Sequence, residues 1–284
     1  MITASLVLYH NDPEEYGRAI NSFLSSVPTG EIWVVDNSSN PLENALFDDP
    51  RVHYIYNGEN LGFGRAHNKA ISQIPPSSFA HLIVNPDIYF ERNVVPELEA
   101  ALSRNPEVGV VMPRISYPDG SLQRLTKLLP TPMDLIFRRF LPSSWMKKKL
   151  NSRYELHDLP DGQEAEIPSL SGCFILVRTE ALRRIGGFDE RYFMYMEDVD
   201  LVRRIGDFSK TLYVPSVTAI HSYAKGSYIN PKLLKFHIES ACKYFMKWGW
   251  FIDRQRSQRN AVTLARIANI NNERKICKHS DSGT

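Results

Sequence analysis

The chain has 284 residues, of which 43% are hydrophobic and 23% are charged, and its formal net charge is +2. This composition is typical of a globular protein with one large α/β domain and room for an appended segment; it predicts no nucleic-acid partner. There is no apolar run of 18 residues and no signal-peptide pattern, and the three cysteines have no metal-binding spacing, so we expect a cytoplasmic protein with reduced thiols and no membrane-spanning helix.

The first 90 residues alternate between strand and helix patterns. Asp12 is a candidate N-cap, Pro13 suits the first helical position and Glu15 would complete a capping box. The predicted strands cover 2–9, 31–35, 52–56 and 80–84, and helices are predicted from 12, after 41 and over 62–74. This alternation predicts an α/β fold with a mostly parallel, mixed central sheet and helices on both faces.

The rest of the chain is less regular at first. Residues 113–165 are rich in proline and charge and are expected to form loops around a site. Further on, we predict strands at 169–177, 211–214 and 216–221, and helices at 179–185, 197–205, 231–250 and 253–270. We therefore divide the chain into a main domain (1–225), a C-terminal helical segment (226–272) and a disordered tail (273–284).

Positive charge is concentrated towards the C-terminus. Residues 225–284 carry 12 Lys+Arg against 4 Asp+Glu, whereas the preceding residues carry 22 against 28. A second basic cluster lies within 137–150, where it alternates with large apolar side chains. Such a mixture suits an anionic membrane surface, and it equally suits a solvated helix face.

Polar residues gather where the predicted parallel strands end. Asp36, the segment 60–65 and Asp87 all lie at or just beyond carboxyl ends, which is where open α/β sheets bind ligands. Asn85-Pro86-Asp87 is either an Asx-Pro turn or a place where a carboxylate reaches Mg²⁺ or Mn²⁺ held by a diphosphate. His221 ends an apolar strand, so it is either a hydrogen-bonded structural residue or a second ligand to such a cation.

A glycine-rich helix entry covers residues 60–68, Asn-Leu-Gly-Phe-Gly-Arg-Ala-His-Asn. Its glycines permit close approach to a ligand, and a helix N-terminus favours phosphate. The spacing is neither that of a dinucleotide fingerprint nor that of a Walker loop. His67 is either a ligand or a helix-surface histidine, and we expect the latter.

Three carboxylates follow an aromatic and methionine-rich stretch at 193–196. Acidic residues at a helix start are favoured by the helix dipole, which is a purely structural reason for at least one of them. Asp200 and Arg204 are four residues apart and are expected to pair. Asp198 is the candidate general base, while Glu197 is a site residue without an assigned role.

At these residues the chain resembles the family 2 inverting glycosyltransferases of the GT-A fold, in particular bacterial rhamnosyltransferases of O-antigen assembly. The resemblance spans roughly residues 2–225 as an ordered set of motifs: 35–38 (Val-Asp-Asn-Ser), 60–64 (Asn-Leu-Gly-Phe-Gly), 85–87 (Asn-Pro-Asp), 171–178 (Ser-Gly-Cys-Phe-Ile-Leu-Val-Arg), 187–190 (Gly-Phe-Asp-Glu), 197–201 (Glu-Asp-Val-Asp-Leu) and His221.

The resemblance implies roles for individual residues. Asp198 matches the usual catalytic base, and Asp87 and His221 match residues that contact a divalent cation. Asn85 stands where many relatives have Asp, which leaves one fewer anionic ligand. Together with the motifs above, the resemblance implies that the donor binds against the following residues: Asp36, Asn37, Asn60, Gly62, Gly64, Arg65, Asn85, Gly172, Glu197 and Arg204.

The resemblance also implies a substrate class and a location. The expected donor is a nucleotide-diphospho-sugar, specifically dTDP-β-L-rhamnose, and the expected acceptor is a polyprenyl-diphosphate-linked saccharide at the cytoplasmic face of the inner membrane. A transferase of the same fold that uses a UDP-sugar, a sugar nucleotidyltransferase and a non-catalytic nucleotide- or glycan-binding protein are the alternatives. A nucleotidyltransferase would need a glycine-rich basic loop after the first strand, which this chain lacks. The sequence carries no signal for an oligomeric state.

Overall fold

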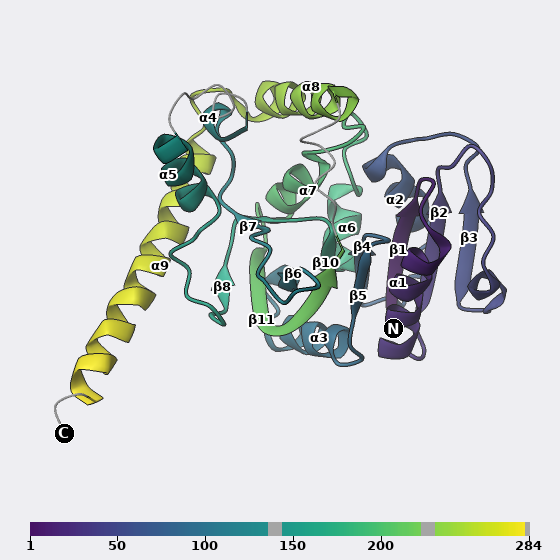
Figure 1. Cartoon of the computed structure of the whole chain (residues 1–284), viewed down its shortest axis with the longest axis horizontal. Helices are drawn as coiled ribbons and strands as arrows, with labels where there is room; N and C mark the ends of the chain where they lie inside the picture. The colour runs from purple at the N-terminus through teal and green to yellow at the C-terminus, as the bar shows by residue number, and fades with distance from the viewer. Residues whose placement is uncertain (136–143, 223–230, 282–284) are drawn as a thin grey trace.

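A computed structural model of the chain describes residues 1–135, 144–222 and 231–281. Within them, eight strands form the path of one central sheet in the order β3-β2-β1-β4-β10-β6-β11-β5, and β8 adds to β11 (Figure 1). The bounds are β1 (Ile2–Leu8), β2 (Glu31–Asp36), β3 (Val52–Tyr56), β4 (Ala80–Val84), β5 (Ile88–Phe90), β6 (Val108–Ser116), β8 (Ala165–Glu166), β10 (Phe174–Arg178) and β11 (Lys210–His221).

The sheet is mixed, with one half that is entirely parallel. β3, β2, β1 and β4 run parallel, so their carboxyl ends share one edge. β10 is antiparallel to both β4 and β6, whereas β6 and β11 are parallel. The predicted α/β class is therefore confirmed.

Helices cover both faces of the sheet. α1 (Pro13–Ser26) and α3 (Val94–Arg104) pack together on one face, and α2 (Phe63–Ile71), α6 (Thr179–Ile185) and α7 (Glu197–Ile205) pack on the other. Asp12 caps α1 by accepting a hydrogen bond from the Glu14 amide, one residue earlier than the predicted capping box requires. A short 3₁₀ helix, η1 (Ala45–Asp48), follows Pro41.

A buried polar chain holds α2 against β1. Nδ1 of His67 lies 2.7 Å from Ser5 Oγ, which lies 2.8 Å from Nε2 of His81. Both rings are fully buried, and burial lowers the pKa of His67 and lowers that of His81 to about 3. The expectation of a helix-surface His67 is wrong, because this histidine faces the sheet.

Two predicted strands differ from the observed ones. Residues 169–177 form two strands rather than one: β9 (Ser169–Leu170) pairs with β7 (Thr126–Lys127) in a separate sheet, and the chain then turns before β10. Conversely, 211–214 and 216–221 belong to the single strand β11, whose register shifts between Val214 and Thr218. A register shift of this kind accommodates Pro215, which has no amide hydrogen for the ladder.

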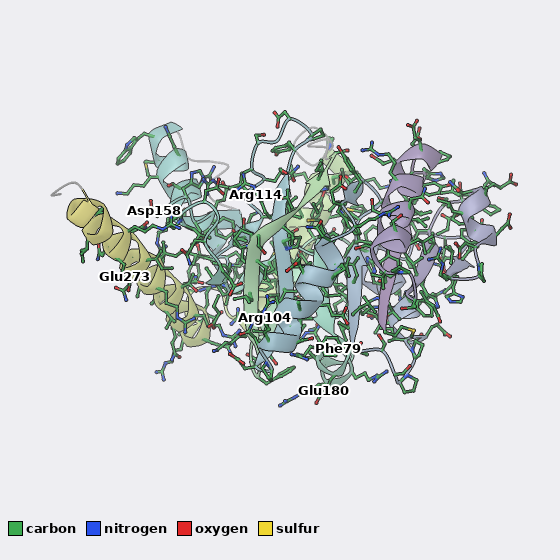
Figure 2. The ribbon with its side chains drawn as sticks, turned by 90° about the horizontal axis from the view of Figure 1, so that it is seen from below. Phe79, Arg104, Arg114, Asp158, Glu180 and Glu273 are labelled. Carbon is green, nitrogen blue, oxygen red and sulfur yellow. The ribbon has the colours of Figure 1, made fainter. Side chains whose placement is uncertain are left out.

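The remaining helices lie at the carboxyl edge and beyond it. α4 (Pro132–Leu135), α5 (Ser144–Tyr154) and α8 (Pro231–Trp248) lie on the same side of the molecule as α7 (Figure 1). α9 (Arg254–Asp281) extends away from the sheet with Glu273 on its distal part, and it stays helical where a disordered tail was predicted (Figure 2). The first half of the basic cluster at 137–150 lies outside the described residues. None of the described helices combines the length and hydropathy needed to cross a bilayer.

Candidate active site

The loop after β2 is built around the carboxylate of Asp36. This side chain is fully buried and accepts hydrogen bonds from the amides of Ser38 (2.8 Å) and Leu42 (2.9 Å) and from the Tyr54 hydroxyl (2.6 Å). Burial, followed by the hydrogen bond to Asp36, raises the pKa of the Tyr54 hydroxyl. Asp36 therefore shapes the loop through three internal contacts.

The glycine-rich entry of α2 is locked to the loop that precedes α7. Gly62 has φ of +82°, and a Cβ on it would lie 2.1 Å from the carbonyl oxygen of Phe193. That same oxygen accepts a hydrogen bond from the Phe63 amide at 3.0 Å. Asn37 donates to the Gly62 carbonyl, and Asn60 accepts from the Gly62 amide. The glycine was predicted to let a ligand approach the backbone closely. In the structure, Gly62 instead lets the backbone of the loop before α7 approach the start of α2.

A groove of about 450 Å³ opens beside this entry and is lined by residues of α2, the preceding loop and Glu190. Arg65 lines it and pairs with Glu190 at 3.1 Å, with about half of each side chain exposed. Such an exposed pair exchanges readily, so Arg65 is a cation that an anionic ligand can reach. Gly64 lies beneath, where a Cβ would be 3.0 Å from Phe188.

The two predicted metal-binding residues meet. His221 Nε2 lies 3.1 Å from Asp87 Oδ2, and the other carboxylate oxygen, Oδ1, is buried without a hydrogen-bond partner among the described residues. The side-chain amide of Gln123 donates from Nε2 to the backbone carbonyl oxygen of His221 at 2.9 Å. This bond turns the amide oxygen Oε1 of Gln123 towards Nδ1 of the His221 ring, 2.9 Å away. In this arrangement Nδ1 carries the proton and Nε2 presents its lone pair.

Asp87 and His221 fit a divalent cation whose other ligands come from a bound molecule and water. An imidazole nitrogen, an orphaned carboxylate oxygen and a 3.1 Å separation suit two adjacent ligands of an octahedral ion, which lie about 3 Å apart. In the described part of the chain no three His, Cys, Asp or Glu side chains cluster as a metal site. A bound molecule and water would supply the other ligands. Burial, followed by the nearby charge of Asp87, raises the pKa of Glu15 on α1.

Two consecutive residues, Gly172 and Cys173, join Asp198 to the segment that carries Asp87. The amide of Gly172 donates to Asp198 Oδ2 at 2.9 Å, and a Cβ on Gly172 would come within 2.7 Å of the Asp198 Cβ. The next residue, Cys173, accepts from the Asn85 amide through its carbonyl oxygen at 2.8 Å. Burial, followed by the charges of Asp87 and Asp198, raises the pKa of the Cys173 thiol to about 12, so both carboxylates lie near the thiol.

Glu197 is buried beside the candidate base. It is 5% exposed, and its Oε2 has no hydrogen-bond partner in the described residues. Burial, followed by the charge of Asp198, raises the pKa of Glu197 to about 8, against the opposing effect of two backbone hydrogen bonds. At neutral pH, Glu197 is therefore mainly a neutral acid.

Asp200 and Arg204 anchor α7. The predicted pair is confirmed at 2.7 Å, and Arg204 also donates to the carbonyl oxygens of Ile185 and Gly187. Asp200 is fully buried and further accepts from Lys247 at 2.7 Å and from the Trp248 indole at 2.8 Å. Arg204 was predicted to bind the donor, but these contacts use its guanidinium within the protein. Asp200 thus joins α7 to α8, which the sequence did not reveal.

The loop that leads into α7 is strained and clasped by α8. Tyr195 and Met196 both adopt left-handed backbone conformations, with φ of +69° and +68°. Two consecutive non-glycine residues in this region cost on the order of 1–3 kcal/mol each, and such strain persists only where the surroundings impose it. Ser240 of α8 donates to the Met194 carbonyl at 2.8 Å, and Lys243 donates to that of Arg191 at 2.7 Å.

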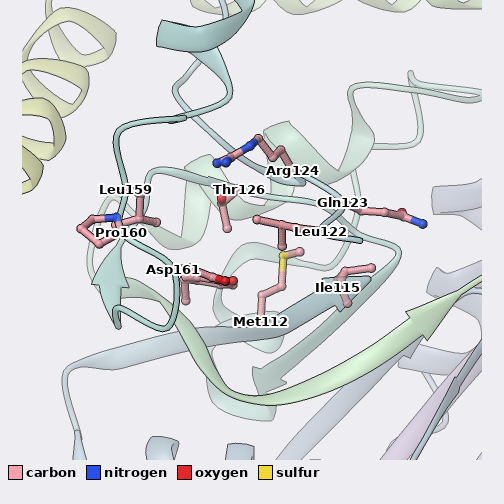
Figure 3. A pocket seen from close by; sticks show the side chains of 10 residues that line it. Met112, Ile115, Leu122, Gln123, Arg124, Thr126, Leu159, Pro160 and Asp161 are labelled. Carbon is pink, nitrogen blue, oxygen red and sulfur yellow. The ribbon is translucent and has the colours of Figure 1, made fainter. Parts of the chain in front are cut away.

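A separate enclosed pocket lies behind Gln123, between β6 and the segment 159–161 (Figure 3). Its volume of about 20 Å³ holds roughly one water molecule, so it is too small for a nucleotide. Figure 3 shows the Gln123 amide directed away from Asp161, in keeping with its hydrogen bonds to His221. This pocket is therefore distinct from the groove beside α2.

Sequence comparison identifies the family. The model of the family described as Glycosyl transferase family 2 matches residues 6–186. The chain belongs to this family. The N-acetylglucosaminyl-diphospho-decaprenol L-rhamnosyltransferase of Mycobacterium tuberculosis is 34% identical over 232 residues, which cover 76% of this chain and 75% of the relative. Rhamnosyltransferase WbbL of Escherichia coli is 37% identical over 79 residues, 27% of this chain and 30% of the relative.

Solved structures agree with the GT-A fold of this glycosyltransferase. TarS of S. aureus in complex with UDP-GlcNAc has a TM-score of 0.58 at 13% identity, covering 93% of this chain and 71% of that one. A mannosyltransferase from Pyrobaculum calidifontis, solved with GDP-Man and Mn²⁺, has a TM-score of 0.52 at 15% identity, covering 94% of this chain and 75% of that one. At these identities the likeness shows the fold alone.

Proposed function

We propose that this glycosyltransferase moves a sugar from a nucleotide-diphospho-sugar to an acceptor hydroxyl with inversion, and that Asp198 is its base. One observation carries the proposal: Asp198 accepts a hydrogen bond from the Gly172 amide, and the carbonyl oxygen of the next residue, Cys173, accepts one from the Asn85 amide, so the candidate base and the segment that carries Asp87 meet beyond the end of β4. One carboxylate belongs to a pair suited to a cation, and the other lies at the start of α7. This division suits an enzyme that stabilises a departing diphosphate on one side and removes a proton on the other.

Asp198 has the surroundings of a positioned base. The amides of Gly172 and Val199 each donate to one of its oxygens, at 2.9 and 2.8 Å, which fixes the carboxylate plane. Its remaining lone pairs take the proton of the acceptor hydroxyl as that oxygen bonds to the anomeric carbon. The bond from this carbon to the diphosphate oxygen breaks on the opposite face, and the nucleoside diphosphate leaves with the electron pair.

Asp87 and His221 would hold a Mg²⁺ or Mn²⁺ ion, and Gln123 would keep His221 in the tautomer that can coordinate it. When bound, such an ion neutralises charge that develops on the leaving diphosphate. Arg65 and the N-terminus of α2 add positive potential on the groove side. The strained loop at 195–196 keeps the base and α2 in a fixed relation, because Phe193 contacts Gly62.

The preferred donor is dTDP-β-L-rhamnose, and the preferred acceptor is a polyprenyl-diphosphate-linked saccharide. The support is the name of the mycobacterial relative, a rhamnosyltransferase of a lipid-linked N-acetylglucosamine, together with its 34% identity. An acceptor of this kind resides in a membrane, so we place the enzyme at the cytoplasmic face of the inner membrane in cell-surface polysaccharide synthesis. The basic C-terminal segment suits that location.

The test is release of nucleoside diphosphate from a panel of sugar nucleotides, with Mn²⁺ or EDTA and with or without a lipid-linked N-acetylglucosamine acceptor. We expect acceptor-dependent release from dTDP-rhamnose that stops with EDTA. Release from a UDP-sugar alone would replace the donor assignment. Binding without release from any donor would identify a non-catalytic homologue.

A further inference from the structure

The turn between α8 and α9 exposes two neighbouring large apolar side chains. Phe251 is 80% exposed and Ile252 is 86% exposed, more than any other large apolar residue that the structure describes. Leaving two such side chains in water forgoes the free energy that their burial would release. A contiguous apolar tip of this kind marks a surface that another phase or molecule covers.

The turn is held in a fixed conformation. Arg256 is 4% exposed and lies beneath the turn, where its guanidinium donates to the carbonyl oxygens of Gly249, Trp250 and Phe251 at 3.2–3.4 Å. Gly249 has φ of +100°, and a Cβ on it would lie 2.5 Å from the Ile252 carbonyl oxygen. The two side chains are therefore presented outwards by a pinned backbone.

A second apolar and basic element lies at the same end of the molecule. Asn260 and Arg256 bind the backbone of Leu129 and Pro130, just before α4, and α4 packs against α5 (Figure 1). α5 contains four Lys or Arg residues and no acidic one, and its Trp145 is 66% exposed. The side chains of Lys148, Lys149 and, after the turn, Arg254 are also exposed.

We propose that residues 249–252 insert Phe251 and Ile252 into an anionic lipid bilayer, with Trp145 as a second apolar contact. Arg254, Lys148 and Lys149 would bind the lipid phosphates. An outward apolar tip flanked by cations complements the acyl and headgroup layers of an anionic membrane. This inference rests on the proposed function in that a membrane-borne acceptor gives the docking its purpose.

The geometry links such docking to the active site. α8 ends at this turn, and its Lys247 and Trp248 hold Asp200 of the catalytic helix at 2.7 and 2.8 Å. The start of α7, with the candidate base, is thus tied to the element that would meet the membrane. α7, whose first turn carries Asp198, lies on the same side of the molecule as α8 (Figure 1), so a lipid-linked acceptor would approach from that side.

The test is flotation of the full chain with vesicles of phosphatidylcholine, alone or with about 30% phosphatidylglycerol, which supplies the anionic surface. The variant Phe251→Ser/Ile252→Ser should lose at least roughly tenfold in partitioning into anionic vesicles, because two exposed apolar side chains no longer enter lipid. The matched control is Val262→Ser/Ile276→Ser, which removes two exposed apolar side chains of α9 and should partition like the unaltered chain. Flotation of the turn variant at the control level would overturn the proposal.

Two further arms distinguish membrane docking from self-association and from a fault in the proposed function. Equal binding to neutral and anionic vesicles would overturn the role of the cations, and loss of a dimer on substitution of the turn would assign it to self-association instead. Transfer to a short water-soluble acceptor should be the same in the turn variant as in the unaltered chain. If the unaltered chain floats with vesicles but transfers no sugar, the result counts against the proposed function alone. If it transfers sugar but does not float, the result counts against the docking alone.

Discussion

Replacing Glu197 with glutamine should make the stability of the protein less sensitive to pH. Glu197 is 5% exposed, and burial together with the Asp198 charge raises its pKa from 4.5 to about 8. Below pH 4.5 the carboxyl group is protonated in both the folded and the unfolded chain and costs nothing. As the pH rises, the unfolded chain loses this proton while the fold retains it, so the contribution of Glu197 to stability is progressively lost.

The magnitude follows from the two pKa values. Between pH 5 and 8 the free energy of unfolding should fall by roughly 1.4 kcal/mol per pH unit relative to the Glu197→Gln variant, which does not titrate at this position. At pH 7 the accumulated difference is about 3 kcal/mol, and it levels off above the folded pKa of about 8. The new amide adds a pH-independent cost of about 1–3 kcal/mol where it lacks a partner.

Urea unfolding of both proteins at pH 5, 6, 7 and 8 measures this difference. The control is Glu190→Gln, since Glu190 is about half exposed in its pair with Arg65 and should give a small, flat difference. A Glu197→Gln difference that stays constant from pH 5 to 8 would refute the neutral-acid assignment. A difference of the opposite slope would mean that Glu197 is ionised and stabilised by a cationic partner.

Three other predictions concern the remaining parts of the site. Asp87→Ala should abolish the Mn²⁺-dependent part of donor binding in calorimetry, and affinity that is equal in both proteins with and without Mn²⁺ would contradict the metal role. Gln123→Leu should weaken Mn²⁺ binding about 10–100-fold by freeing the His221 tautomer, with Gln123→Glu restoring part of it; unchanged Mn²⁺ affinity would count against this positioning role. Gly62→Ala should destabilise the fold by several kcal/mol, because its Cβ would meet the Phe193 carbonyl at 2.1 Å; a melting temperature like that of the parent would contradict this packing.

Local patterns predicted the parallel half of the sheet well. The alternation of apolar strands and capped helices located β1, β2, β3 and β4 with small errors at their ends, because each is a short, largely apolar strand bounded by turn residues. No such pattern predicted β5, α3 or β6. The break between β9 and β10 at Gly172 was not predicted either, because it depends on the Asp198 side chain 26 residues later.

The candidate site was predicted in its residues more than in its contacts. Asp87 and His221 were predicted as partners by type and position, and the structure places them 3.1 Å apart. Gln123 was missed because its hydrogen bonds to His221 span 98 residues and no motif marks it. The neutral state of Glu197 was missed for a similar reason, because its burial arises from packing between distant segments.

The most direct test of the mechanism is the single-turnover rate of Asp198→Asn with a bound donor and a saturating acceptor. We predict a rate about 10²–10⁴-fold below that of the unaltered enzyme, the usual contribution of a general base, with donor affinity unchanged. Cys173→Ser, which alters a buried neighbour of the same carboxylate, serves as the control and should retain most of the rate. A near-normal rate for Asp198→Asn would contradict the assignment of Asp198 as the base and, with it, the proposed mechanism of transfer.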